Sequence, residues 1–215
     1  MRMPLHRLLS PVWMGCLVLG ALCTLSGCTS RVVSHHSPDY AHHRPTHIAV
    51  MPIHNATGKP LTAPPARAYI KTLLERAFFS HDHTANNVDV AWRRHIQYAL
   101  RQKGYQVLPL QVVDTNVEGT SSKERLASPE APATKLSGVD GLLYSTITAW
   151  DTRKLKTDNA ITVAASFELV DATSQRVLWA AEWPYGNVSI KATQPWHDIR
   201  YYIARLVDDA FVTLP

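Results

Sequence analysis

Cysteine is scarce in this sequence: there are three cysteines in 215 residues, and all of them lie before residue 29. A disulfide-rich scaffold and a metal centre built from several cysteines are therefore excluded.

Acidic residues are also fewer than basic ones, 17 against 22, for a formal net charge of +5. Basic residues cluster at Arg93-Arg94 and at Lys154 with Lys156, and we interpret the first pair as a solvated helix face. No nucleic-acid partner is expected.

Familiar catalytic motifs are missing as well. The sequence has no glycine-rich phosphate loop, no H-E-x-x-H zinc helix and no G-x-S-x-G nucleophile elbow. We therefore expect no catalytic residue, no cofactor and no enzyme activity.

The N-terminus, by contrast, has the layout of an export signal. Arg2 and Arg7 give it a basic start, and a mostly apolar run follows over residues 8–25. The run ends in a tetrapeptide that resembles the lipobox of bacterial lipoproteins, Leu25-Ser26-Gly27-Cys28. We predict a signal peptide over residues 1–27, in which Leu25, Ser26 and Gly27 are recognised by the signal peptidase. A retained transmembrane helix over residues 8–25 is the alternative.

Cys28 is the predicted lipidation site. Its thiolate can displace a phospholipid head group to form a thioether with diacylglycerol, and its amine, freed by cleavage, can also be acylated. Each buried methylene contributes about 0.8 kcal/mol, so two or three acyl chains would make a durable anchor. Cys16 and Cys23 would leave with the signal peptide, so the mature monomer could form no disulfide. Thr29, where lipoproteins retained in the inner membrane have aspartate, predicts the outer membrane, facing the periplasm.

Residues 28–46 are polar, rich in Ser, His and Pro, and without apolar periodicity, so we interpret them as a flexible tether. The tether contains four histidines whose imidazoles could bind zinc, nickel or copper: His35, His36, His42 and His43. Assembling a site from a flexible segment costs conformational entropy, and no cysteine or pair of carboxylates completes the ligand set. We predict no metal site, and a metal-binding envelope protein that uses these histidines is the alternative function.

From residue 47 onward, apolar periodicity predicts strands that alternate with helices. Strands are expected over 47–53, 105–108, 142–150, 161–170 and 176–183, and helices over 66–80, 89–103 and 195–211, with a short helix ending near Gly138. Strict alternation from Ile161 to Val170 indicates a strand with one buried face. The predicted fold class is α/β: one globular domain over residues 47–215, a three-layer α/β sandwich with a mixed sheet of about five strands, ending in an antiparallel hairpin and a C-terminal helix.

Several short pieces of the chain resemble a known family. They are IAVMP at 48–52, GYQVLP at 104–109, GVDGLLY at 138–144, SFELVD at 166–171 and RVLW at 176–179. Together they resemble the DUF799 family of bacterial lipoproteins, distant relatives of the curli secretion lipoprotein CsgG and the penicillin-binding-protein activator LpoB. The resemblance covers roughly residues 47–183 and implies a fold like the N-terminal domain of TolB.

The resemblance also implies a class of function. Proteins of this wider group act as envelope binding or assembly modules, so it implies a non-enzymatic binding, assembly or regulatory module. No catalytic residue is carried over, because the shared motifs are strand cores and turns. The chain lacks the pair of long amphipathic hairpins of a CsgG-like pore, so a secretion channel is not expected. The expected partners are membrane lipid through acylated Cys28 and an envelope protein of unknown identity, or further copies of the chain in a homo-oligomer.

Overall fold

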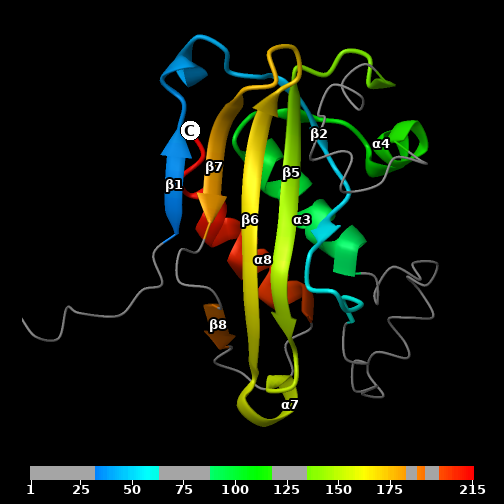
Figure 1. Ribbon diagram of the computed structural model, residues 1–215, viewed down its shortest axis with the longest axis vertical. Helices are drawn as coiled ribbons and strands as arrows, with labels where there is room; N and C mark the ends of the chain where they lie inside the picture. Colours follow the sequence, from blue (N-terminus) through cyan, green and yellow to red (C-terminus); the bar gives the residue numbers. More distant parts are fainter. Residues whose placement is uncertain (1–31, 63–87, 118–134, 183–187, 192–198) are drawn as a thin grey trace, which may run out of the picture. The chain divides into compact units, whose positions relative to one another are not determined.

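The computed structural model describes residues 32–62, 88–117, 135–182, 188–191 and 199–215. Its centre is a mixed sheet of eight strands in which β1, β7, β6, β5, β2 and β4 lie side by side in that order, while β3 pairs with β5 and β8 with β6 (Figure 1). The strands are β1 (Val33–His36), β2 (His47–Val50), β3 (His54–Asn55), β4 (Gln106–Val107), β5 (Gly141–Asp151), β6 (Ala160–Asp171), β7 (Val177–Glu182) and β8 (Val188–Lys191). The helices are a single 3-10 turn η1 (Pro38–Ala41), α3 (Val88–Gln102), α4 (Leu110–Val117), α7 (Leu155–Asp158) and α8 (Ile199–Phe211).

A long antiparallel hairpin of β5 and β6 forms the middle of the sheet. The two strands pair from Gly141 opposite Asp171 to Asp151 opposite Thr162. The alternation read from the sequence is confirmed, because five alternate side chains of β6 are buried on one face: Ile161, Val163, Ala165, Phe167 and Leu169. The predicted second hairpin also forms, since β6 pairs antiparallel with β7.

Helices α3 and α8 cover one face of the sheet. Their apolar stripes contribute the largest core cluster, in which Trp92 of α3 stacks on Phe167 at a ring-centroid distance of 5.8 Å. Phe211 of α8 meets the same Phe167 ring edge-on at 5.4 Å. Helix α3 ends where the sequence predicts, because Gly104 adopts a φ of +87° that side-chain-bearing residues rarely tolerate. The predicted helices at 89–103 and at the C-terminus are thus confirmed.

The opposite face of the sheet is packed around β2 and β5. Residues of β2 alternate between the two faces, so that Ile48 and Val50 join the α3–α8 core while Ala49 joins a second cluster. In that second cluster Val113 and Val117 of α4 pack against the sheet. The sheet is therefore an inner layer with helices on both sides, which agrees with the predicted α/β architecture.

The N-terminal segment differs from its prediction. We predicted a flexible tether over residues 28–46, but its described part, residues 32–46, belongs to the domain. Strand β1 pairs antiparallel with β7, and the Ser37 N–H donates to the carbonyl of Leu178 at 2.9 Å. Tyr40 of η1 is only 6% exposed, and its hydroxyl contacts that of Tyr105. Pairing with a distant strand supplies hydrogen bonds that local composition does not reveal, which is why the prediction was wrong here and the domain begins before residue 47.

The sheet is also larger than the predicted five strands. Strands β1, β3 and β8 are too short to carry a periodic signal, and helix α4, which begins directly after Pro109, was not among the predicted helices. The predicted helix over 66–80 lies outside the described residues, as does most of the segment before Gly138.

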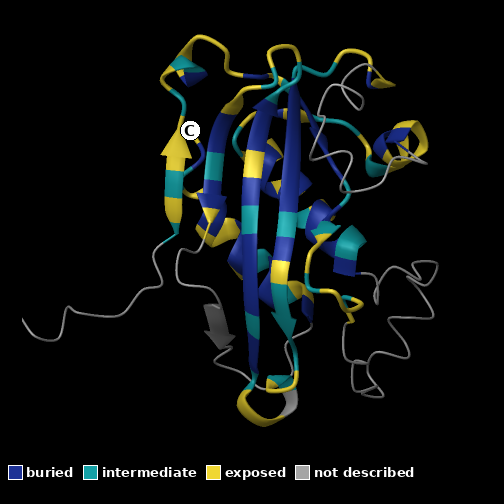
Figure 2. Cartoon of the chain, viewed as in Figure 1, coloured by how far each residue is buried: buried dark blue, intermediate teal, exposed yellow. Residues whose placement is uncertain are grey.

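Figure 2 shows that buried positions concentrate along β5, β6 and β7, whereas β1 and the turns are mostly exposed. Within the described ranges, no helix is both long and apolar enough to cross a membrane.

Candidate functional site

A groove of about 700 Å³ lies between α3 and α4. One wall is the outer side of α3, and the other is the segment from Pro109 to Thr115. The lining side chains are mixed in chemistry, with apolar ones at Val90, Pro109 and Leu110 and polar ones at Arg94, Gln97, Arg101, Gln111, Asp114 and Thr115. A partner docking here would meet both apolar contacts and hydrogen-bonding groups.

A buried arginine holds the two walls together. Arg93, 1% exposed, donates from Nη2 to Asp114 of α4 at 2.7 Å and from Nη1 to Asp89 of α3 at 3.2 Å. The same Nη2 donates to the carbonyl of Val50 at the end of β2 at 3.2 Å. A guanidinium removed from water must be neutralised and hydrogen-bonded, so these contacts fix α3, α4 and β2 relative to one another.

The same network extends to the loop after β2. The second carboxylate oxygen of Asp89 accepts the N–H of Ile53 at 2.9 Å. On the groove side, the Gln97 amide donates to the carbonyl of Leu108 at 2.6 Å, which fixes the chain that leads into α4. The groove is therefore shaped by polar contacts within the chain.

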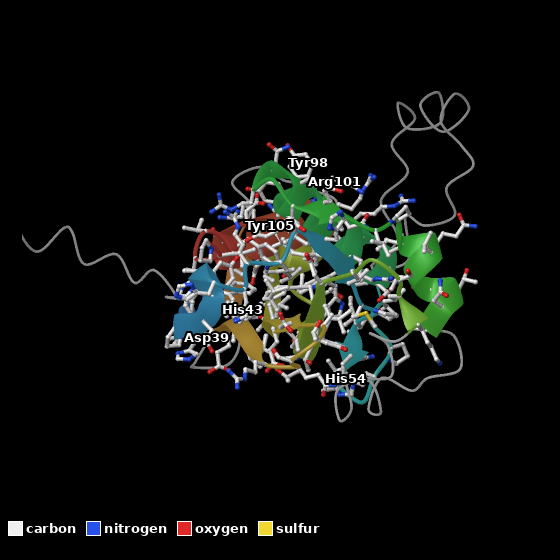
Figure 3. All side chains as sticks on the ribbon, turned by 90° about the horizontal axis from the view of Figure 1, so that it is seen from above. Asp39, His43, His54, Tyr98, Arg101 and Tyr105 are labelled. Carbon is white, nitrogen blue, oxygen red and sulfur yellow. The ribbon has the colours of Figure 1, made fainter. Side chains whose placement is uncertain are left out.

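The α3 wall of the groove carries positive charge. Arg94 and Arg101 are two turns apart on α3, and both are exposed. Asp114, the acidic side chain in the lining, already pairs with Arg93. Figure 3 shows Arg101 beside Tyr98 on the outer side of α3, where Tyr98 is 59% exposed. Because arginine binds carboxylates through paired N–H donors, this wall suits an acidic segment with an adjoining apolar or aromatic residue.

The predicted lipidation site falls on a part of the chain that is not described. Leu25, Ser26, Gly27 and Cys28 all lie outside the described residues, as do the other two cysteines. The signal peptide and the acylated cysteine therefore stay predictions.

The four histidines considered as metal ligands are now placed. His35 and His36 are consecutive residues of β1 and so project to opposite faces of the sheet. His42 and His43 follow η1, and Figure 3 shows His43 near Asp39 on this segment, far from His54. Among the described residues no group of three or more His, Cys, Asp or Glu side chains is arranged to hold a metal ion.

The end of the sheet near His43 is organised by two aspartates. Asp140 accepts the N–H groups of Thr46 and His47 at 2.9 and 2.7 Å, and so ties the start of β2 to β5. Asp171 accepts the N–H groups of Thr173 and Ser174 in the β6–β7 turn. Burial alone would raise the pKa of Asp171, but the hydrogen bonds from Ser174 and Thr173 and the nearby His43 lower it overall. Both aspartates thus serve the fold.

Sequence reasoning missed the groove because it treated Arg93 and Arg94 alike. The structure exposes Arg94 but buries Arg93, so the interpretation of the pair as a solvated face is wrong for Arg93. A signal was present: Arg93 follows Trp92 on the apolar side of the helix and lies four residues after Asp89, the spacing of a helical ion pair. Its third contact, Asp114, is 21 residues away and could not be found by local spacing.

Comparison with protein-family models and with curated protein sequences gives no match. Among solved structures, the chain is similar to the PelC dodecamer from Paraburkholderia phytofirmans, with 15% identity, 83% of this chain and 95% of that chain covered, and a TM-score of 0.43. It is similar to lipoprotein GNA1162 from Neisseria meningitidis, with 20% identity, 80% and 100% covered, and a TM-score of 0.46. The LpoB C-terminal domain from Salmonella enterica shows 14% identity, 68% and 83% covered, and a TM-score of 0.34. The structures similar to this chain therefore include bacterial lipoproteins.

Proposed function

We propose that this protein is a lipid-anchored lipoprotein of the bacterial outer membrane that faces the periplasm and acts as a non-enzymatic binding or assembly module. The observation that carries the proposal is the lipobox Leu25-Ser26-Gly27-Cys28, directly after an apolar export signal. The anchor is diacylglycerol on the Cys28 sulfur with a further acyl chain on its amine. Two or three chains bind a bilayer durably, whereas one does not.

The groove between α3 and α4 is the surface we assign to partner binding. The buried Arg93 joins its two walls, and the α3 wall carries the exposed Arg101. The partner class that fits this chemistry is an envelope protein with an exposed acidic segment. Self-association into a homo-oligomer through another surface is compatible with the same role.

Membrane attachment is tested by fractionating cells that express the full chain, with membranes separated by density. The native protein is expected in the outer membrane fraction and in the detergent phase. Cys28→Ala should leave the outer membrane fraction and remain uncleaved in the inner membrane, because residues 8–25 are then retained, while Cys23→Ala, a matched loss of one cysteine inside the signal peptide, should behave as the native protein. Native protein that partitions into the aqueous phase would contradict the proposal.

Partner binding is tested by crosslinking in intact envelopes. Arg101→Glu reverses a charge in the groove, and Arg205→Glu makes the same change on an exposed residue of α8 that does not line it. We expect the first variant to lose a crosslinked envelope protein that the second retains. Equal crosslinking in the two variants would remove the groove from the proposal.

A further inference from the structure

The point at which the chain enters the sheet limits how far the domain can stand from its anchor. Val33, the first residue of β1, pairs with Glu182 of β7, so the fold begins there and not after a long tether. Val33 is only five residues after Cys28. Since an extended chain covers at most 3.3–3.6 Å per residue, these residues span at most about 18 Å.

The hairpin of β5 and β6 extends beyond this entry point. Glu182 pairs with both Val33 and Ser166, which places Val33 level with Ser166 along the sheet. From Ser166, β6 continues back for six residues to Ala160, and at about 3.3 Å per residue this overhang is about 20 Å. The connection that carries α7 lies farther still, at the lower end of Figure 1.

We infer that the tip of this hairpin, residues 152–159, rests on the phospholipid surface that holds the acylated Cys28. The inference rests on the proposed lipidation. With the sheet upright, the overhang of the tip is at least as long as the extended chain from Cys28, so the bilayer cannot approach the anchor without meeting the tip.

Contacts among the residues of the tip and with the core define its conformation. Asp151 and Arg153 form a paired ion bridge whose closest atoms are 2.7 Å apart, and Leu155 packs against the main core. Asn159 adopts the left-handed conformation that turns the chain into β6. Lys154 is exposed, and residues 151–159 contain three basic and two acidic side chains. This excess of positive charge favours anionic head groups over neutral ones.

The test uses the full-length lipidated protein in vesicles of phosphatidylethanolamine and phosphatidylglycerol that contain a spin-labelled quencher lipid. Thr157→Cys carries a fluorophore at the tip, and Ser174→Cys carries it in the exposed β6–β7 turn at the opposite end of the sheet. Labelling is selective because the mature chain has no other cysteine than Cys28, whose sulfur is consumed by the lipid. We expect strong quenching at 157 and almost none at 174.

The remaining outcomes separate the two proposals. Equal quenching at 157 and 174 in lipidated protein would mean that the sheet lies flat or stands clear, and would overturn the tip contact alone. Protein without acyl mass would overturn the lipidation and the tip contact with it. In the 157-labelled chain, Lys154→Glu should lower the equilibrium constant of the tip contact by at least about fivefold in these vesicles, since the lost basic residue contributes about 1 kcal/mol at an anionic surface and the new carboxylate is repelled by it. Arg205→Glu is the matched control and should leave it unchanged.

Discussion

Strand β6 and the N-terminal segment over residues 32–46 both contribute to the same sheet, but only β6 can be recognised from its sequence pattern. Strand β6 has an apolar residue at every second position from Ile161 to Leu169, whereas residues 32–46 have no periodicity and are rich in histidine and proline. Yet β1 and η1 are joined to the domain by strand pairing, by buried Tyr40 and by an ion pair between Asp39 and Arg176 at 3.1 Å. The position of a regular core strand can be predicted from its own residues, whereas a short edge strand forms because a distant strand pairs with it.

The largest effect should come from the regular strand. Phe167→Ala removes a fully buried ring that contacts both Trp92 and Phe211, and we expect it to lower the free energy of unfolding by about 3–5 kcal/mol. Urea unfolding followed by tryptophan fluorescence measures this. A loss below about 1 kcal/mol would mean that β6 is not the centre of the core.

The N-terminal segment should matter nearly as much. Tyr40→Ala deletes a buried ring and its contact with Tyr105, so the expected loss is near the lower end of the same range, about 3 kcal/mol. Asp39→Ala breaks an exposed ion pair of the same segment and should cost less than about 1 kcal/mol. If both changes were neutral in urea unfolding, residues 32–46 would be the tether that their composition predicts.

A smaller effect should follow from crowding the contact between residues 32–46 and strand β5. A Cβ added to Gly141 of β5 would lie 2.8 Å from the Cβ of Pro45, too close without movement of the chain. We expect Gly141→Ala to destabilise the domain by about 1–3 kcal/mol, and protease cleavage within residues 32–46 should become faster. Unchanged stability and cleavage would show that Pro45 does not pack on β5.

The smallest effect at neutral pH should come from Tyr40→Phe, which removes a hydroxyl and its hydrogen bond with Tyr105 and should cost about 1 kcal/mol. The same variant should differ from the native protein in another way in alkali. Burial and the hydrogen bond with Tyr105 raise the pKa of Tyr40 above its ordinary value of 10.0. A raised pKa means that stability is complete below about pH 10 and is lost as the pH rises beyond it. Tyr40→Phe should therefore flatten part of the stability loss above about pH 10. Burial also raises the pKa of Tyr202, so some loss should remain in the variant.

Much of the fold could be predicted because it is encoded in periodic segments. The stripes of α3 and α8, the left-handed stop at Gly104 and the alternation of β6 are all local properties of the sequence. What could not be predicted depends on contacts between distant residues. The pairing of β1 with β7 joins residues about 145 apart, and the buried Arg93 finds its partner Asp114 on another helix. The groove depends on the contact between Arg93 and Asp114, so neither the groove nor that contact could be found by local spacing.

The lipidation prediction has the opposite character, because it depends on four consecutive residues and on no tertiary contact. The most direct test of the account is the intact mass of the protein purified from membranes. The account predicts a mature chain that begins at Cys28 and carries the added mass of diacylglycerol and an acyl chain. A full-length chain with no added mass would contradict it and would make residues 8–25 a retained membrane anchor.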